Sequence, residues 1–121
     1  MAAGSFRLIV RQGANPDRME EFKESARQAV ASTEAAEPGT LGYEWFVAED
    51  GSDCCLNEFY VSSEAFLTHF QNIGPTIAKM LEMSPLLEAI VLGDPEPEAR
   101  KALAAIGAKF YKPLAGFSRL R

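Results

Sequence analysis

Residues 41–61 constrain the fold most, because a short polar turn joins two aromatic-rich segments there. Leu41 to Ala48 and Cys54 to Val61 have the length and composition of β-strands. The four residues between them, Glu49-Asp50-Gly51-Ser52, contain an Asp-Gly pair, which is typical of a tight hairpin turn. This segment therefore predicts an antiparallel hairpin with Asp50 and Gly51 at its tip.

A turn at Asp50 and Gly51 sets the register of this hairpin and assigns every side chain to a face. The facing pairs are Tyr43 with Glu58, Trp45 with Leu56, and Leu41 with Tyr60. The face that holds these pairs also carries Val47 and Cys54, and the opposite face carries Gly42, Glu44, Phe46, Ala48, Cys55, Asn57, Phe59 and Val61. Both faces are largely apolar, whereas a sheet with one solvated face alternates apolar and polar residues. We therefore expect the chain's own helices to cover one face and a second subunit to cover the other, in a homodimer packed sheet against sheet.

The remaining elements follow from hydrophobic spacing and from helix start and stop signals. They are expected as a strand at 6–12, a helix from Asn15-Pro16-Asp17 to Glu37-Pro38-Gly39, a helix capped by Ser62 or Ser63 and broken at Gly74-Pro75, a short helix at 76–81, a strand at 85–92, and a helix at 97–106 ended by Gly107. The order β-α-β-β-α-β predicts an α+β, ferredoxin-like fold, with a four-stranded antiparallel sheet and helices on one face. We expect residues 1–93 to form this domain, and residues 94–121 to form a helix and an extended tail that packs on the domain or on the partner subunit.

Composition excludes several classes of function. The chain has 121 residues, a formal net charge of −5 and a pI near 4.9, which disfavours a nucleic-acid-binding protein. No apolar run approaches the roughly 20 residues of a membrane span, and the N-terminus lacks a signal-peptide pattern, so we expect a cytoplasmic protein without membrane contact. Adjacent Cys54 and Cys55 point to opposite faces of a strand and are expected to be free thiols. No nucleotide-binding loop, flavin motif or spaced metal-ligand set is present, so no cofactor and no metal are predicted.

Three segments resemble a known family. Glu37-Pro38-Gly39-Thr40-Leu41-Gly42-Tyr43-Glu44, then Asn57-Glu58-Phe59-Tyr60, then Ser63-Glu64-Ala65-Phe66-Leu67-Thr68-His69-Phe70 are similar to the pattern of antibiotic biosynthesis monooxygenase domains. The resemblance covers about residues 5–92. It implies a dimeric α+β barrel with a small-molecule pocket between sheet and helices. It also implies oxidation of quinols or anthrones by dioxygen without metal or flavin.

The chain departs from the family pattern at two places. Tyr60 stands where the family most often has Trp, at the end of the second hairpin strand. Haem-degrading relatives pair that Trp with a helix His and with an Asn on the first strand. Here the first strand offers Arg7 and Arg11 but no Asn, which disfavours haem degradation.

His69 is the main candidate for a catalytic residue, because imidazole titrates near neutral pH and the family position matches. It is predicted to accept a proton from a bound phenol. Glu58, opposite Tyr43, is the second catalytic candidate: a buried carboxyl group needs a partner, and it can orient His69 or bind a substrate hydroxyl. The predicted substrate contacts are the aromatic side chains of Tyr43, Tyr60, Trp45 and Phe66.

Each candidate also has a purely structural explanation. A buried His can donate to a backbone carbonyl, a Tyr–Glu hydrogen bond can be structural, and aromatic rings, Trp45 above all, can simply fill the core. The predicted function is cofactor-independent monooxygenation of quinol-like or polycyclic phenolic small molecules. The alternatives are a non-catalytic small-molecule binding protein of the same fold and an oxygen-independent isomerase or decarboxylase.

Overall fold

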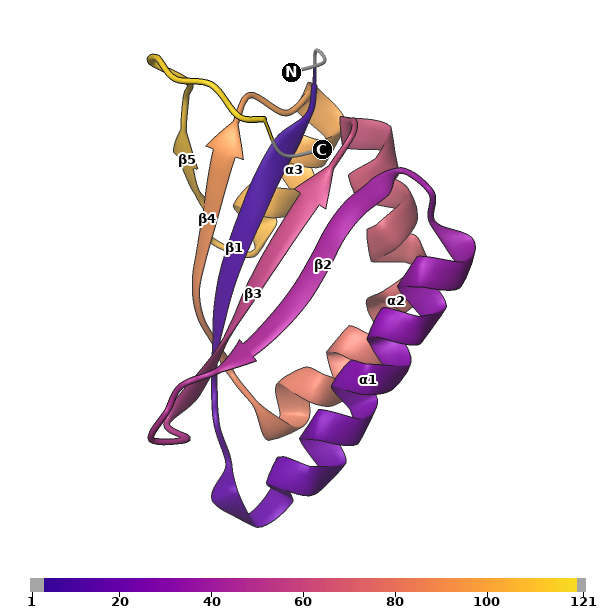
Figure 1. Cartoon of the computed structure of the whole chain (residues 1–121), viewed down its shortest axis with the longest axis vertical. Coiled ribbons are helices and arrows are strands. Elements are labelled where there is room, and N and C mark those ends of the chain that lie inside the picture. The colour runs from indigo at the N-terminus through magenta and orange to yellow at the C-terminus, as the bar shows by residue number, and fades with distance from the viewer. Residues whose placement is uncertain (1–3, 120–121) are drawn as a thin grey trace.

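A computed structural model describes residues 4–119 of the chain (Figure 1). The described elements, in chain order, are β1 (Phe6–Gly13), a 3-10 turn (Pro16–Arg18), α1 (Met19–Ala36), β2 (Thr40–Val47), β3 (Asp53–Tyr60), α2 (Ser63–Met83), β4 (Leu86–Gly93), α3 (Pro97–Ala105) and β5 (Lys109–Tyr111). The α+β, ferredoxin-like order is confirmed. None of the helices within residues 4–119 is long and apolar enough to cross a membrane.

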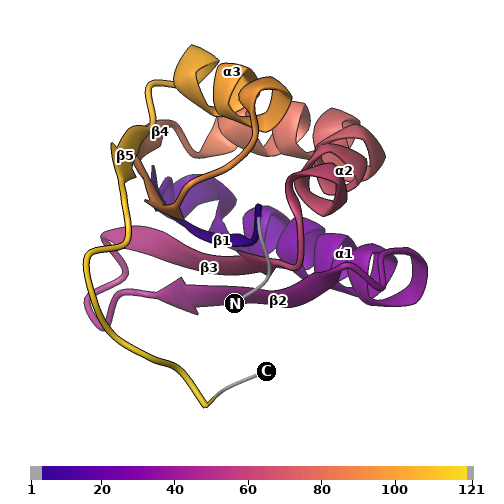
Figure 2. The same cartoon turned by 90° about the horizontal axis from the view of Figure 1, so that it is seen from above.

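The strands form one sheet that curves around the helices, as Figure 2 shows from above. Its strand order is β2-β3-β1-β4-β5, so β1 lies in the middle. The strand predicted at 6–12 is present as β1, and its alternate residues Phe6, Leu8 and Val10 are buried under the helices. The main core joins this inner face of the sheet to Phe66 of α2 and to Leu103 of α3.

The sheet has five strands, so the prediction of a four-stranded antiparallel sheet was wrong on this point. Lys109–Tyr111 forms β5, which pairs with β4 in parallel (Ile90 with Lys109, Leu92 with Tyr111). This pairing requires α3 as a crossover from β4, since parallel neighbours cannot be joined by a hairpin. Beyond β5 the chain carries exposed apolar side chains, with Leu114 98% and Phe117 81% accessible.

The hairpin register is confirmed over most of its length. Tyr43 pairs with Glu58 and Trp45 with Leu56, which places all four on the inner face. The predicted pairing of Leu41 with Tyr60 was wrong, because Thr40 pairs with Tyr60 and the register shifts between Thr40 and Gly42. Such a bulge inserts one extra residue into a strand. It leaves Leu41 exposed.

Helix α2 continues without a break through Gly74-Pro75, where a helix break was predicted. Pro75 cannot donate a backbone hydrogen bond to the carbonyl of Gln71. Gln71 and Pro75 both lie on the exposed side of the helix, where water can donate a hydrogen bond to that carbonyl. Ile73 and Met80, buried on the other side, keep the apolar stripe in contact with the core across the proline.

The outer face of the sheet carries exposed apolar side chains among polar ones. Phe46 is 53% and Leu92 38% accessible there, and Asn57 donates a hydrogen bond to Glu44 at 2.9 Å. Exposed apolar side chains that gather on one face of a chain are a common feature of contact sites. The homodimer packed through this face stays a prediction: light scattering at micromolar concentration is expected to give twice the chain mass of 13.2 kDa. A single-chain mass would contradict it.

Candidate active site

A cavity of about 240 Å³ lies between the inner face of the sheet and helix α2. Its walls are almost wholly apolar. Three of its few polar lining groups, His69, Glu58 and Tyr43, lie next to one another. The lining residues are Leu8, Val10, Gln12, Tyr43, Leu56, Glu58, Phe66, His69, Phe70, Ile73, Gly74, Ile77, Ala78, Leu81, Leu86, Ala102 and Ile106. A mainly apolar pocket with a few convergent polar groups is the usual form of a small-molecule site.

Two local features bring α2 onto the start of β2 and so assemble the polar groups. The Ser62 side chain caps α2 by accepting a hydrogen bond from the backbone N–H of Ala65. Gly39 lets the chain pass directly against that first turn, since a Cβ at this position would lie 2.8 Å from the Cβ of Ala65. This close approach holds Glu37 beside the middle of α2.

His69 is buried and forms a hydrogen bond with Glu37, at 2.7 Å between Nδ1 and Oε1. The same carboxylate accepts hydrogen bonds from Thr40 Oγ1 at 2.8 Å and from Asn72 Nδ2 at 2.6 Å. The donors Thr40 and Asn72 suit the ionised form of this carboxylate, which accepts hydrogen bonds and does not donate them. We therefore assign the imidazole proton to Nδ1, which leaves the lone pair of Nε2 free to accept a proton.

Nε2 of His69 faces the second buried carboxyl group of the site. It lies 3.7 Å from Glu58 Oε1, which is longer than a hydrogen bond. A substrate oxygen placed to the side of this pair can lie within hydrogen-bond distance of both atoms. Burial lowers the pKa of His69, and the charge and hydrogen bond of Glu37 act against this effect. The ring is therefore neutral at pH 7 and able to act as a base.

Glu58 has a strongly perturbed acidity. Burial raises its pKa to about 7, the hydrogen bond from Tyr60 opposes this, and the negative charge of Glu37 adds to it. The Tyr60 hydroxyl donates that bond to Glu58 Oε1. Near pH 7 the Glu58 carboxyl is then about half protonated, and below neutral pH it is largely protonated and can itself donate a hydrogen bond to a ligand.

Tyr43 brings an unused donor to the same place. Its ring contacts that of His69 edge to face, with centroids 4.6 Å apart. Its hydroxyl is buried and has no acceptor for its proton within the described residues, although the Trp45 side chain, which can only donate, interacts with it and, against the larger effect of burial, lowers its pKa. Burial, followed by the negative charge of Glu58, raises the pKa of Tyr43, so the hydroxyl keeps its proton. A buried donor without a partner costs stability, and a bound ligand oxygen would remove that cost.

The structure brings together four of the six predicted site residues. His69, Glu58, Tyr43 and Phe66 all line the cavity. Tyr60 lies behind Glu58 and is fully buried, with its ring 5.4 Å from that of Phe66.

Trp45 does not line the cavity and instead packs edge to face against Phe22 of α1, at 5.6 Å. Its indole N–H makes no hydrogen bond of normal geometry in the part of the chain that the structure describes, but its side chain interacts with Tyr43 and, against the larger effect of burial, lowers the pKa of that residue. Direct substrate contacts of Tyr60 and Trp45 stay predictions.

Glu37 is the residue that sequence reasoning missed, because it was interpreted only as part of a helix stop. A signal was available in its position at the C-terminal cap of α1, which has no basic residue in its last turn. A carboxylate there is repelled by the negative end of the helix dipole, so another interaction must favour it. That interaction is the contact with His69, 32 residues further along the chain.

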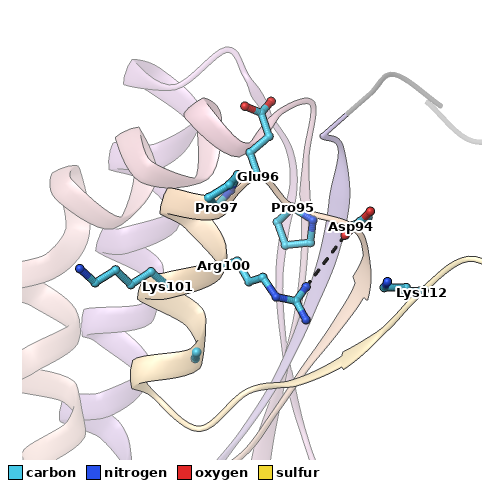
Figure 3. A pocket seen from close by; sticks show the side chains of 8 residues that line it. Asp94, Pro95, Glu96, Pro97, Arg100, Lys101 and Lys112 are labelled. Atoms are coloured by element: carbon cyan, nitrogen blue, oxygen red, sulfur yellow. Dashed lines mark ion pairs between the residues drawn. The ribbon is translucent and has the colours of Figure 1, made fainter.

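A larger hollow, of about 830 Å³, lies beside α3 at the chain's surface (Figure 3). Most of its lining side chains are exposed, and Arg100 forms an ion pair with Asp94 at 3.9 Å. No buried polar groups converge there, so the cavity at His69 is the better candidate site. Across residues 4–119, no group of three or more His, Cys, Asp or Glu side chains is arranged to hold a metal ion.

The single histidine makes the role of Glu37 directly measurable. We expect Glu37→Gln to lower the pKa of His69 further, because the carboxylate charge that raises it is removed while burial remains. NMR titration of the one imidazole in the chain gives this value without ambiguity of assignment. Glu34→Gln, on the exposed side of α1, is the matched control and is expected to leave the titration unchanged. An unchanged or raised pKa in Glu37→Gln would contradict the contact.

Comparison with known proteins gives one family and many similar structures. The sequence profile of the antibiotic biosynthesis monooxygenase family matches residues 5–80. MupZ from Pseudomonas fluorescens has 22% identity and a TM-score of 0.85, over 96% of this chain and 95% of MupZ. Rv0793 from Mycobacterium tuberculosis has 22% identity and a TM-score of 0.66, over 78% of this chain and 98% of its own. A variant of SnoaB, a cofactor-independent oxygenase from Streptomyces nogalater, has 15% identity and a TM-score of 0.63, over 78% and 97%. Comparison of the sequence with curated proteins finds no match.

Proposed function

We propose that this chain, which belongs to the antibiotic biosynthesis monooxygenase family, is a cofactor-independent monooxygenase of small phenolic or quinol-like molecules. The observation that carries the proposal is the neutral, Glu37-bound His69, whose Nε2 faces a small apolar cavity beside Glu58. The name of one structural relative, SnoaB, gives the same class of reaction.

The first step is removal of a proton from a substrate hydroxyl by Nε2 of His69. Glu37 stabilises the resulting imidazolium, because its carboxylate contacts Nδ1. The protonated Glu58 carboxyl and the Tyr43 hydroxyl can each donate a hydrogen bond to the substrate anion. The apolar walls exclude water and so favour an electron-rich anion that reacts with dioxygen.

The overall reaction balances without a further reductant. Dioxygen accepts four electrons, all of them from the substrate. One oxygen atom enters the substrate at the carbon that carries the anion's charge, and the other leaves as water with two substrate hydrogens. The proton held by His69 returns to the departing oxygen, which restores the neutral imidazole.

The size of the cavity bounds the substrate. Its volume of about 240 Å³ lies below the roughly 300–1,000 Å³ of pockets for drug-sized ligands. Among the predicted substrates, this favours quinols and phenols of one to three rings over larger polycyclic ones.

Oxygen uptake by the purified protein tests the proposal. The panel contains hydroquinones, naphthohydroquinols and anthrones, and the product is identified by mass. We expect oxygen consumption coupled to a product with one more oxygen atom and two fewer hydrogen atoms. Turnover that persists under nitrogen would favour an isomerase or decarboxylase, and tight binding without turnover would favour a binding protein. Either result would contradict the proposal.

A further inference from the structure

We infer that helix α3 acts as a specificity element, and that Ala102 and Ile106 limit the length of an apolar substituent on the substrate. The inference rests on the proposed function, since it concerns the same cavity. It goes beyond the family resemblance, because the family profile ends at residue 80 and α3 (Pro97–Ala105) follows it.

The cavity extends well beyond the polar groups at His69. On α2 its lining continues from His69 through Ile73 and Ile77 to Leu81. The distance from His69 to Leu81 along the helix axis is roughly 18 Å, at 1.5 Å per residue. These α2 side chains are apolar, and among the described residues the one polar side chain that lines this part, Gln12, already donates a hydrogen bond to the Ser84 carbonyl at 3.3 Å. The extension therefore suits a hydrocarbon chain and not a second polar group. A phenol held at His69 would therefore direct a substituent along α2.

Helix α3 closes this extension from the β4 side. Ala102 of α3 and Ile106, the residue that caps the C-terminal end of α3, both line the cavity. Ile106 is 37%, Leu81 38% and Phe70 45% accessible, so these three apolar side chains stand where the cavity meets the surface. A small residue at 102 leaves space that a larger one would fill.

Helix α3 is held firmly enough to set such a limit. Ala99 and Leu103 are fully buried in the main core. The N-terminal end of α3 is tied to α2, because the backbone N–H of Glu96 donates to Ser63 Oγ at 2.8 Å.

The other end of α3 closes through Gly107, at φ +81°, and continues into β5. Arg100 adds a contact on the outer side, with its guanidinium group 4.0 Å from the ring centre of Phe110 and its ion pair to Asp94 (Figure 3). The helix is therefore fixed at its start, its middle and its end.

The inference is tested with a series of 4-alkylphenols, from methyl to octyl, whose affinities are measured by calorimetry under nitrogen. Each buried methylene is expected to raise affinity roughly fourfold, until the chain reaches the surface and affinity stops rising. We expect Ala102→Leu to stop the rise at a shorter chain and Ile106→Ala to stop it at a longer one. Ala105→Leu, the same change on the exposed side of α3, is the matched control and is expected to match the native protein.

The two variants shift the limit in opposite directions, so a general loss of stability cannot imitate the result. The inference would be overturned if both variants fold and their affinity stops rising at the same alkyl-chain length as in the native protein. Binding is measured without oxygen, so the failure of this inference is distinct from that of the proposed function. If the variants change the alkyl-chain length limit but the native protein never consumes oxygen, the role of α3 is supported and the proposed monooxygenase function is contradicted.

Discussion

His69→Gln is expected to lower kcat for oxygen-dependent turnover by about 10²- to 10⁴-fold, the usual contribution of a general base. Glutamine is similar in length and can still hydrogen-bond to Glu37, but it cannot accept a proton at neutral pH. The loss should appear equally in kcat and in kcat/KM, because the proton transfer stabilises the transition state and not the bound substrate. The assay is oxygen uptake with the best substrate of the panel.

Gln71→Ala, an exposed position two residues further along α2, is the control for this experiment and should keep native activity. Thermal unfolding of both variants checks that the fold is intact. A His69→Gln enzyme within about tenfold of the native rate would show that another group removes the proton.

Glu58→Gln is expected to stabilise the protein in alkaline solution by about 3 kcal/mol. The pKa of Glu58 lies near 7 in the folded chain against a reference of 4.5, and each unit of difference corresponds to about 1.36 kcal/mol. The folded state binds this proton more tightly than the unfolded state does, so stability is highest below pH 4.5 and falls as pH rises through 7. Glutamine stays neutral and can still accept the hydrogen bond from Tyr60.

Urea unfolding at pH 5 and at pH 8.5 measures this effect. The variant should be more stable than the native protein by only about 1 kcal/mol at pH 5 and by about 3 kcal/mol at pH 8.5. Glu49→Gln, in the exposed turn of the same hairpin, is the matched control and should show no such pH-dependent gain. A difference independent of pH would mean that Glu58 does not titrate in this range.

The pH dependence of the catalytic rate should reflect the ionisation of Glu58. The native rate is expected to fall above about pH 7, because ionised Glu58 next to Nε2 repels the substrate anion. Glu58→Gln should keep its activity there. A descending limb that remains in the variant would assign it to a different group.

Much of the fold could be predicted from local patterns. The Asp50-Gly51 turn and the alternation of residues in the two strands were enough to pair Tyr43 with Glu58 and Trp45 with Leu56. The predictions that failed are those in which packing overrides a local sequence signal. Gly74-Pro75 is a strong helix-breaking signal, yet α2 continues, because apolar contacts on both sides of the proline outweigh one lost hydrogen bond.

The candidate site was only half predictable. His69 stood out as the one histidine, and the register of the hairpin placed Glu58 and Tyr43 on its side of the sheet. Glu37 could not be assigned in this way, because its partner belongs to another helix and no local period links the two.

The order of residues is sufficient for the α+β class, the hairpin register and the division of its side chains between two faces, since these depend on neighbours along the chain. The tertiary structure decided that Glu37 holds Nδ1 of His69, that burial raises the pKa of Glu58 to about 7, and that α3 closes the cavity. Acidity and pocket shape depend on which distant groups are buried together, and that arrangement exists only once the helices have packed onto the sheet.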